Sequence, residues 1–277
     1  MKNNQHLQQP LAIDVISIQS QVIYGCVGNS AAIPTLEQRG FTVAGVPTVL
    51  LSNTPLYPTM YGGVISDEWF SGYLQGLEER QALKQARAII LGYLGSPSQA
   101  RILTQWLGKI RQNYPDIAIF IDPVMGDIDV GLYVDKGLAL EYREHLCALA
   151  TGLTPNHFEL EFLLDCKIHT TEEAKEAAKS LLNTQTQWVI ATSAVESEWI
   201  EGTMQYIVAT HEGTVVKSHP YYHTDAKGTG DTFMASVIAN LLSGLDVYQA
   251  AEQASQRVME VIMRTRQAEV NELILID

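Results

Sequence analysis

The chain has 277 residues, of which 46% are hydrophobic and 18% charged, and its formal net charge is -13. This composition indicates a globular protein with a large buried core and excludes a disordered chain. The negative charge argues against nucleic acid or an anionic membrane as a partner, because both would repel it. An anionic ligand would therefore have to be held locally, by glycine loops, helix starts, a few basic side chains and a divalent metal.

The cysteines and the first residues indicate a cytoplasmic protein. Cys26, Cys147 and Cys166 are scattered and odd in number, so they predict neither a disulfide framework nor a metal site. Residues 1–10 are polar and lack the apolar core of a signal peptide, and we expect them to form a flexible tail. No apolar run is long enough to span a bilayer.

Strand and helix patterns alternate along the first half of the chain. Runs rich in β-branched or apolar residues predict strands at 12–19, 41–50, 88–91 and 117–121. Capping residues and apolar periodicity predict helices from Asn29 or Ser30 to about Arg39, and over 66–83 and 98–113. Residues 52–63 are polar and broken by Pro and Gly, which predicts a mobile loop.

The second half continues the alternation. We expect helices at about 136–150, from Asn156 to about Leu164, and over 171–183, 232–242 and 247–263. A short strand closes at Leu153, another covers 188–192, and residues 206–210 and 214–218 read as a hairpin.

This order predicts an α/β fold with three α/β/α layers around a mostly parallel sheet. No repeat, low-complexity block or linker interrupts it, so residues 1–277 are expected to form a single domain. Ligands of such folds bind where loops leave the carboxyl ends of the strands. Ser20, Asp122, the 154–156 segment and Thr192 each follow a predicted strand, which places them in one crevice.

The segment 224–233 carries the strongest chemical signal. Gly228 and Gly230 flank Thr229, and Asp231 follows at the start of a predicted helix. Inward-pointing glycine N–H groups and a helix start form an anion-binding concavity, where a carboxylate is unfavourable unless it has a chemical role. One interpretation is that Asp231 accepts a hydroxyl proton while the amides hold a phosphoryl group. The alternative is an ordinary loop with an acidic residue in the first helical turn.

Two further motifs are open to a structural or a functional interpretation. Asp122 and Pro123 directly follow an apolar strand, which fits either a simple turn or a residue at a metal–phosphate site. Asn156 and Glu159 fit either a helix capping box or two groups facing that same site through water.

The first and third predicted strands also end in candidate ligand contacts. Ser20 could hydrogen-bond a small polar ligand, and Tyr93 could offer its face to an aromatic ring or be a core-edge tyrosine. Gly25 and Gly28 lack the full dinucleotide-binding glycine spacing, so an NAD-dependent dehydrogenase is poorly supported.

Taken together and in order, these motifs resemble the pyridoxal kinases of the ribokinase-like superfamily. The resemblance runs from about Ile13 to Ile276 and rests on these segments: 20–30, 52–55, 92–95, 122–127, 154–156 with Glu159, and 227–231. It implies ATP-dependent phosphorylation of the 5′-hydroxymethyl group of the B6 vitamers pyridoxal, pyridoxine and pyridoxamine. It also implies Mg²⁺, a monovalent cation such as K⁺, and a homodimer.

The resemblance assigns roles to individual positions. Asp231 matches the catalytic base, with the Gly228 and Gly230 amides on the transferring phosphoryl group. Positions matched to the vitamer are Ser20 and Leu56, with Tyr93 and Asp231 beside them. Positions matched or adjacent to the nucleotide are Asp122, Thr154, Asn156, Thr192, Thr229 and the stretch from His219 to Tyr222. Apart from the resemblance, we infer that Lys227 could neutralise the moving phosphoryl group. Glu159 and Tyr133 match the metal site, Tyr133 more plausibly through its backbone carbonyl than its phenol.

One position departs from the family pattern. Related kinases often carry a histidine where this chain has Leu56, which can offer only apolar contact, so vitamer preference can differ. A kinase of the same fold acting on hydroxymethylpyrimidine or a sugar is the nearest alternative. A non-catalytic vitamer-binding protein is another, although Asp122, Glu159 and Asp231 argue against it.

Overall fold

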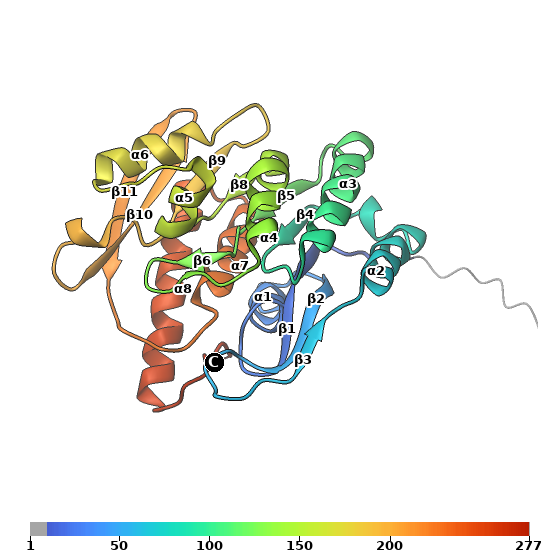
Figure 1. Cartoon of the computed structure of the whole chain (residues 1–277), viewed down its shortest axis with the longest axis horizontal. Helices are drawn as coiled ribbons and strands as arrows, with labels where there is room; N and C mark the ends of the chain where they lie inside the picture. Colours follow the sequence, from blue (N-terminus) through green and yellow to red (C-terminus); the bar gives the residue numbers. More distant parts are fainter. Residues whose placement is uncertain (1–9, 277) are drawn as a thin grey trace, which may run out of the picture.

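The computed structural model describes residues 10–276, which build a nine-stranded sheet covered by helices on both faces (Figure 1). Residues 1–9 of the expected flexible tail lie outside this range. In spatial order the strands are β11 (Gly213–Pro220), β10 (Thr203–Thr210), β9 (Trp188–Ala191), β8 (Gly152–Leu153), β5 (Ala118–Ile121), β4 (Ala88–Leu91), β1 (Val15–Tyr24), β2 (Val43–Asn53) and β3 (Gly62–Val64). The run from β9 to β2 is parallel, while β3 and β10 run antiparallel to their neighbours. The predicted mostly parallel α/β class is confirmed.

Successive residues of a strand point to opposite faces of the sheet, so each face has its own apolar side chains to bury. Helices cover both faces for this reason. Ile89 and Leu91 of β4 belong to one core cluster, and Ala88 and Ile90 of the same strand belong to the other. The first cluster receives side chains from α2 (Asp67–Glu79), α3 (Pro97–Asn113), α4 (Lys136–Glu141), α5 (His157–Leu164) and α6 (Thr171–Ser180). The second receives them from α1 (Asn29–Glu37), α7 (Thr229–Leu242) and α8 (Val247–Gln267).

The first two strands are longer than the sequence predicts. β1 continues to Tyr24, and its pairing with β2 shifts between Gln19 and Gln21, so Ser20 sits at a bulge inside the strand instead of after it. The predicted loop at 52–63 is partly a hairpin, because β2 runs to Asn53 and β3 pairs back onto it. The connecting loop is thus residues 54–61.

The predicted helix at 136–150 is broken into three pieces. After α4, a π-helical turn covers Tyr142–Leu146 and a 3₁₀ turn covers Cys147–Leu149. Tyr142 is fully buried, and its hydroxyl donates to the carbonyl of Gly92 at the end of β4. This bond fixes the loop that carries Tyr93.

Three smaller features complete the fold. A two-stranded ribbon of β6 (Gly126–Asp127) and β7 (Gly131–Leu132) stands above the sheet and was not predicted. Further 3₁₀ turns lie at Ala82–Lys84 and Glu196–Glu198. Helix α7 begins at Thr229, three residues before the predicted start, so Asp231 lies within its first turn. None of the described helices is both long and apolar enough to cross a membrane.

Candidate functional site

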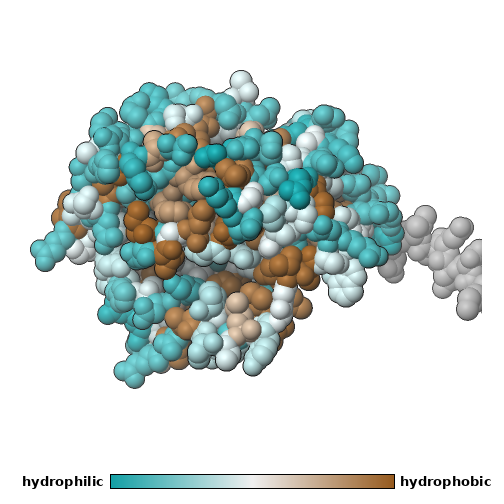
Figure 2. Space-filling model, in the orientation of Figure 1, coloured by the Kyte–Doolittle hydropathy of each residue, from teal (hydrophilic) through white to brown (hydrophobic). Residues whose placement is uncertain are grey.

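The carboxyl ends of the parallel strands bring together residues that are far apart in sequence. Asp122, Thr154 and Thr192 directly follow the neighbouring strands β5, β8 and β9. His219 joins the same edge, because β11 runs antiparallel to β10 and therefore in the direction of β9. These predicted residues thus lie in a row along one edge of the sheet. In Figure 2 the visible face is hollowed below the place of β6.

Helix α7 leaves its first N–H groups without a side-chain cap. Its N-cap is Gly228, whose φ of 98° lies in the left-handed region that favours glycine. Helices α2, α3, α5, α6 and α8 are each capped by a side-chain oxygen, from Ser66, Ser96, Asn156, Thr170 and Asp246. Like α7, helix α1 lacks a side-chain cap, since its N-cap is Gly28. Uncapped amides at a helix start are available to a phosphate group.

The two uncapped helix starts lie against each other. The backbone of Gly28 hydrogen-bonds the carboxylate of Asp231. A Cβ atom on Gly228 would stand 1.8 Å from the carbonyl oxygen of Cys26, and one on Gly28 would stand 2.2 Å from that of Ser20. The structure therefore brings Ser20, Gly28, Gly228 and Asp231 into one cluster in which glycine is required for close backbone approach.

Asp122 stands close enough to Asp231 and to Glu159 for its charge to repel theirs. Burial, followed by the charge of Asp231, raises the pKa of Asp122 to about 8, although a hydrogen bond from Thr154 opposes the shift. Burial also raises the pKa of Asp231, opposed by hydrogen bonds from the backbone of Gly28 and its own N–H. Burial, and then Asp122, raises the pKa of Glu159. An acidic cluster of this kind favours a cation between its members.

Glu159 has a confirmed structural role. Its Oε2 accepts the N–H of Asn156 at 2.8 Å while Asn156 Oδ1 accepts the N–H of Glu159 at 2.9 Å, which is a complete capping box on α5. Its Oε1 accepts the N–H of Met125 at 3.0 Å. Asn156 Nδ2 also donates to the carbonyl of Gly126, at 2.8 Å, so α5 and the β6–β7 ribbon are fixed together.

The acidic cluster fits a hydrated Mg²⁺ better than a dehydrated one. Among residues 10–276 no group of three or more His, Cys, Asp and Glu is arranged to hold a metal ion. Mg²⁺ commonly keeps waters and uses one or two carboxylates with substrate phosphates, so two carboxylates suffice. Tyr133 is half exposed, and burial and nearby carboxylates, Glu159 first, raise the pKa of its phenol, which therefore stays neutral.

A cavity of about 700 Å³ opens beyond the carboxyl ends of β8 and β9. Its lining includes Asn156, Lys167, Ser193, Trp199 and Tyr221. The rings of Trp199 and Tyr221 lie 5.7 Å apart at 54°. An aromatic wall beside polar groups suits the base and sugar of a nucleotide. Lys167 and Trp199 were not predicted, since neither stands in a recognisable motif.

The remaining predicted residues lie in the segments after β2, β4 and β11 or at the start of α7. Leu56 and Tyr93 are half-buried on the side of β2 and β4. Thr229 is in the first turn of α7, and Lys227 just before it is exposed. Tyr222 lies in the segment after β11, where Arg266 stands over its ring at 5.9 Å.

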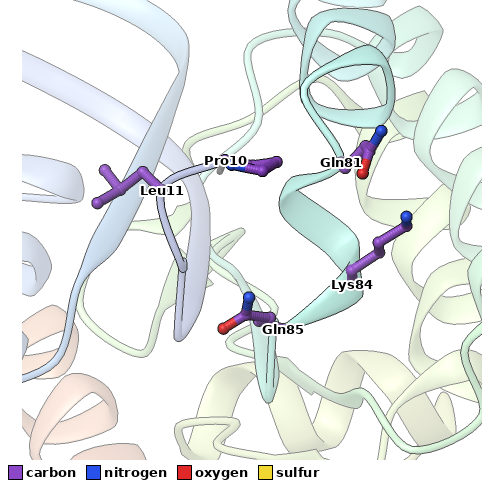
Figure 3. A pocket seen from close by; sticks show the side chains of 5 residues that line it. All are labelled: Pro10, Leu11, Gln81, Lys84 and Gln85. Carbon is purple, nitrogen blue, oxygen red and sulfur yellow. The ribbon is translucent and has the colours of Figure 1, made fainter. Parts of the chain in front are cut away.

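A second cavity, of about 320 Å³, lies away from these residues. Figure 3 shows its lining side chains, which are Pro10, Leu11, Gln81, Lys84 and Gln85. It offers a single charged group and none of the predicted site residues, so we do not assign it to the reaction.

The chain is similar to several known proteins. Residues 80–274 match the phosphomethylpyrimidine kinase family. The pyridoxine/pyridoxal/pyridoxamine kinase of Bordetella bronchiseptica is 48% identical over 96% of this chain and 94% of its own. A pyridoxal kinase of Rubrobacter xylanophilus is 32% identical over 98% of this chain and 93% of its own.

Solved structures share the fold. Pyridoxal kinase from Leishmania donovani in complex with ADP and pyridoxamine has a TM-score of 0.84 at 29% identity, covering 95% of this chain and 90% of its own. A putative phosphomethylpyrimidine kinase from Bacteroides thetaiotaomicron, in a crystal form with pyridoxal, has a TM-score of 0.83 at 30% identity, covering 92% and 89%. The chain belongs to the pyridoxine/pyridoxal/pyridoxamine kinase family, whose members are phosphotransferases of the ribokinase-like fold.

Proposed function

We propose that this protein transfers the γ-phosphoryl group of ATP to the 5′-hydroxymethyl group of pyridoxal, pyridoxine and pyridoxamine. The observation that carries the proposal is the start of α7, where Asp231 lies in an uncapped first turn after the left-handed Gly228. A carboxylate beside free amides supplies both groups that phosphoryl transfer to an alcohol requires. The names and bound ligands of the relatives support the same chemistry.

In this mechanism Asp231 accepts the proton of the vitamer hydroxyl as its oxygen attacks the γ-phosphorus. The bond to the β,γ-bridging oxygen breaks, and ADP leaves. The amides of Gly228 and Gly230 donate to the oxygens of the transferring group, where negative charge is spread in the transition state. Burial raises the pKa of Asp231 above its ordinary value, which makes it a better base than an exposed aspartate.

The acceptor side of the site consists of Ser20, Leu56 and Tyr93. Ser20 is 7% exposed at the β1 bulge and would hydrogen-bond the pyridine substituents. Tyr93 would contact the ring, and Leu56 would close the site by apolar contact from the 54–61 loop. Closure of this loop would exclude water, which competes with the vitamer as phosphoryl acceptor.

The nucleotide would lie across the carboxyl ends of β5, β8, β9 and β11. Its phosphates would face Asp122, Thr154, Asn156 and Thr229, with Lys227 neutralising the transferred group. The adenosine would extend past Thr192 toward the cavity of Trp199 and the stretch from His219 to Tyr222.

Asp122 and Glu159 would hold Mg²⁺, mostly through water, with the Tyr133 loop beside them. The ion would neutralise the phosphate charge that these carboxylates otherwise repel. A monovalent cation such as K⁺ is proposed from the family resemblance alone.

We also propose a homodimer. Large apolar side chains are exposed at the end of β1 (Ile23 by 76%, Tyr24 by 61%), just before and in β3 (Tyr61 by 72%, Val64 by 51%) and on α2 (Trp69 by 62%). Exposed apolar side chains of this kind are typical of a subunit interface, and a second copy would cover them. Light scattering should give twice the monomer mass of 30.6 kDa. A cytoplasmic location is proposed as well, on the three free cysteines.

A panel of four acceptors with MgATP tests the function. Pyridoxal, pyridoxine and pyridoxamine should each yield one phosphorylated product for every ADP. The matched family description makes hydroxymethylpyrimidine the fourth acceptor. Turnover of hydroxymethylpyrimidine alone would replace the proposal with a pyrimidine kinase. Binding of pyridoxal without ADP formation would indicate a vitamer-binding protein.

A further inference from the structure

The carboxylate of Glu272, near the C-terminal end of the chain, joins two loops of the N-terminal part. Its Oε1 accepts the hydroxyl of Thr54 at 2.6 Å, and its Oε2 accepts the N–H of Cys26 at 3.4 Å. The ring of Tyr57 lies 5.8 Å from that of Tyr24, and burial, followed by Tyr24 and Glu272, raises the pKa of its hydroxyl. One side chain therefore contacts the loop after β2 and the loop after β1.

The segment that carries Glu272 is firmly anchored. Leu273 and Leu275 are buried to 4% and 5% exposure, in a small cluster with Ala31, Ala226 and Val261. The N–H of Ile274 donates to Thr265 Oγ1 of α8 at 3.0 Å. Figure 1 shows the C-terminal end beside the loop that joins β2 and β3. Glu272 is thus a fixed support for that loop.

The β1–α1 loop is shaped to receive this carboxylate. A Cβ atom on Gly25, whose φ is +100°, would stand 2.4 Å from Glu272 Oε2 and 2.5 Å from Thr54 Cγ2. Only glycine leaves room for the carboxylate and the threonine methyl at this position.

The same loop continues into the reaction centre. Three residues beyond Gly25, the backbone of Gly28 hydrogen-bonds Asp231. The carbonyl oxygen of Cys26 packs so closely against Gly228 that a Cβ atom on Gly228 would stand 1.8 Å from it. Glu272 therefore links the 54–61 loop, which the proposed function places over the vitamer, to the amides and carboxylate that act on the phosphoryl group.

We propose that Glu272 is a positioning residue that holds the 54–61 loop over the acceptor site and so sets the affinity for the vitamer. The assignment rests on the proposed function, because it takes this loop as the cover of the acceptor. It predicts that loss of the carboxylate weakens vitamer binding far more than nucleotide binding, since the residues placed around the nucleotide make none of these contacts.

Steady-state kinetics of Glu272→Ala, Glu272→Gln and Thr54→Val test this proposal. Glu272→Ala should raise the KM for pyridoxal about tenfold, because it removes hydrogen bonds to a charged group. The KM for ATP should stay within about twofold. Glu272→Gln should be intermediate, since its Oε1 can still accept from Thr54 whereas its amide nitrogen cannot accept from Cys26.

A matched control and a double variant separate positioning from general damage. Glu269→Gln removes one charge from an exposed site three residues away and should leave both KM values unchanged. Thr54→Val keeps the side-chain shape, and the double variant with Glu272→Ala should be no worse than Glu272→Ala alone, because the two residues share one bond. Equal rises in both KM values, or a pyridoxal KM within about twofold of the control, would overturn the proposal.

Hydrogen exchange of residues 54–61 without substrate makes the test independent of catalysis. Exchange should be faster in Glu272→Ala and in Thr54→Val than in Glu269→Gln, and unchanged exchange would refute the anchoring role. If the alanine variant does not fold, the Gln and Val variants decide the question by the same two measurements. A wild-type protein that phosphorylates no vitamer would refute the proposed function. The exchange measurement would still test whether Glu272 holds the 54–61 loop in place.

Discussion

The variant Asp231→Asn isolates the basicity of the proposed catalytic carboxylate. Asparagine keeps the side-chain shape, and its Oδ1 can still accept the hydrogen bond from the backbone of Gly28. The first turn of α7 should therefore stay in place while the proton acceptor is lost. General-base catalysis contributes about 100-fold or more, so kcat should fall by at least about 100-fold, which is about 2.7 kcal/mol of transition-state stabilisation.

The substitution should leave nucleotide binding intact. The charge of Asp231 is one cause of the raised pKa of Asp122, so its removal lowers that pKa and leaves Asp122 more fully ionised. The KM for ATP should accordingly not rise. The assay couples ADP formation to a spectrophotometric readout, with pyridoxal as acceptor.

Asp225→Asn provides the matched control. Asp225 precedes the same glycine loop, its side chain is 77% exposed, and its carboxylate stands 3.5 Å from His223. This variant should keep its kcat within about twofold. A near-normal rate for Asp231→Asn, or an equal loss in both variants, would refute the assignment of Asp231 as the base.

Three further predictions address the glycine loop, the acidic cluster and the helix cap. Gly228→Ala should abolish turnover and lower the melting temperature, because a Cβ atom there would stand 1.8 Å from a backbone oxygen. Gly244→Ala is the control, since Gly244 has a similar φ of 95° but open space around it, and this variant should lose stability only. Equal effects of the two variants on activity would contradict this prediction. The folded-state pKa of Asp122, about 8, exceeds its unfolded value, so the metal-free protein holds more protons when folded and loses stability as pH rises from about 4 to 8. Thermal unfolding across this range should show that loss, to which Asp122 alone contributes at most about 1.4 kcal/mol for each pH unit, and Asp122→Asn should reduce the slope; an unchanged slope would count against the shift. Asn156→Ala and Thr170→Ala each remove a helix cap and should each cost about 1 kcal/mol by denaturant unfolding, but only the first should raise the KM for ATP.

The alternation of strands and helices could be predicted because each element carries a local signal. A few neighbouring residues are enough to recognise a β-branched run, a capping residue or a glycine. The alternation of strands and helices, with short connections, then predicts a mostly parallel sheet. Element ends were less predictable, since the extension of β1 to Tyr24 depends on pairing with β2. Tyr142 of the π-helical turn donates a hydrogen bond to Gly92, fifty residues away in sequence, and local sequence does not indicate such a contact.

The chemical residues of the site were predictable where they stand in motifs. Asp122, Thr154 and Asp231 lie at strand ends or at a helix start, where local sequence already predicts the roles proposed for them. Glu159 had two interpretations, and only its hydrogen bonds identified the capping box. Glu272 carried no local signal, because its function arises from contacts with loops more than two hundred residues earlier.

A crystal structure of the ternary complex with pyridoxal and a non-hydrolysable ATP analogue is the most direct test of the catalytic assignment. The carboxylate of Asp231 should lie within about 2.6–3.2 Å of the 5′-hydroxyl oxygen, with that oxygen in line with the γ-phosphorus. A carboxylate turned toward solvent, or engaged in an ion pair away from the hydroxyl, would contradict the mechanism.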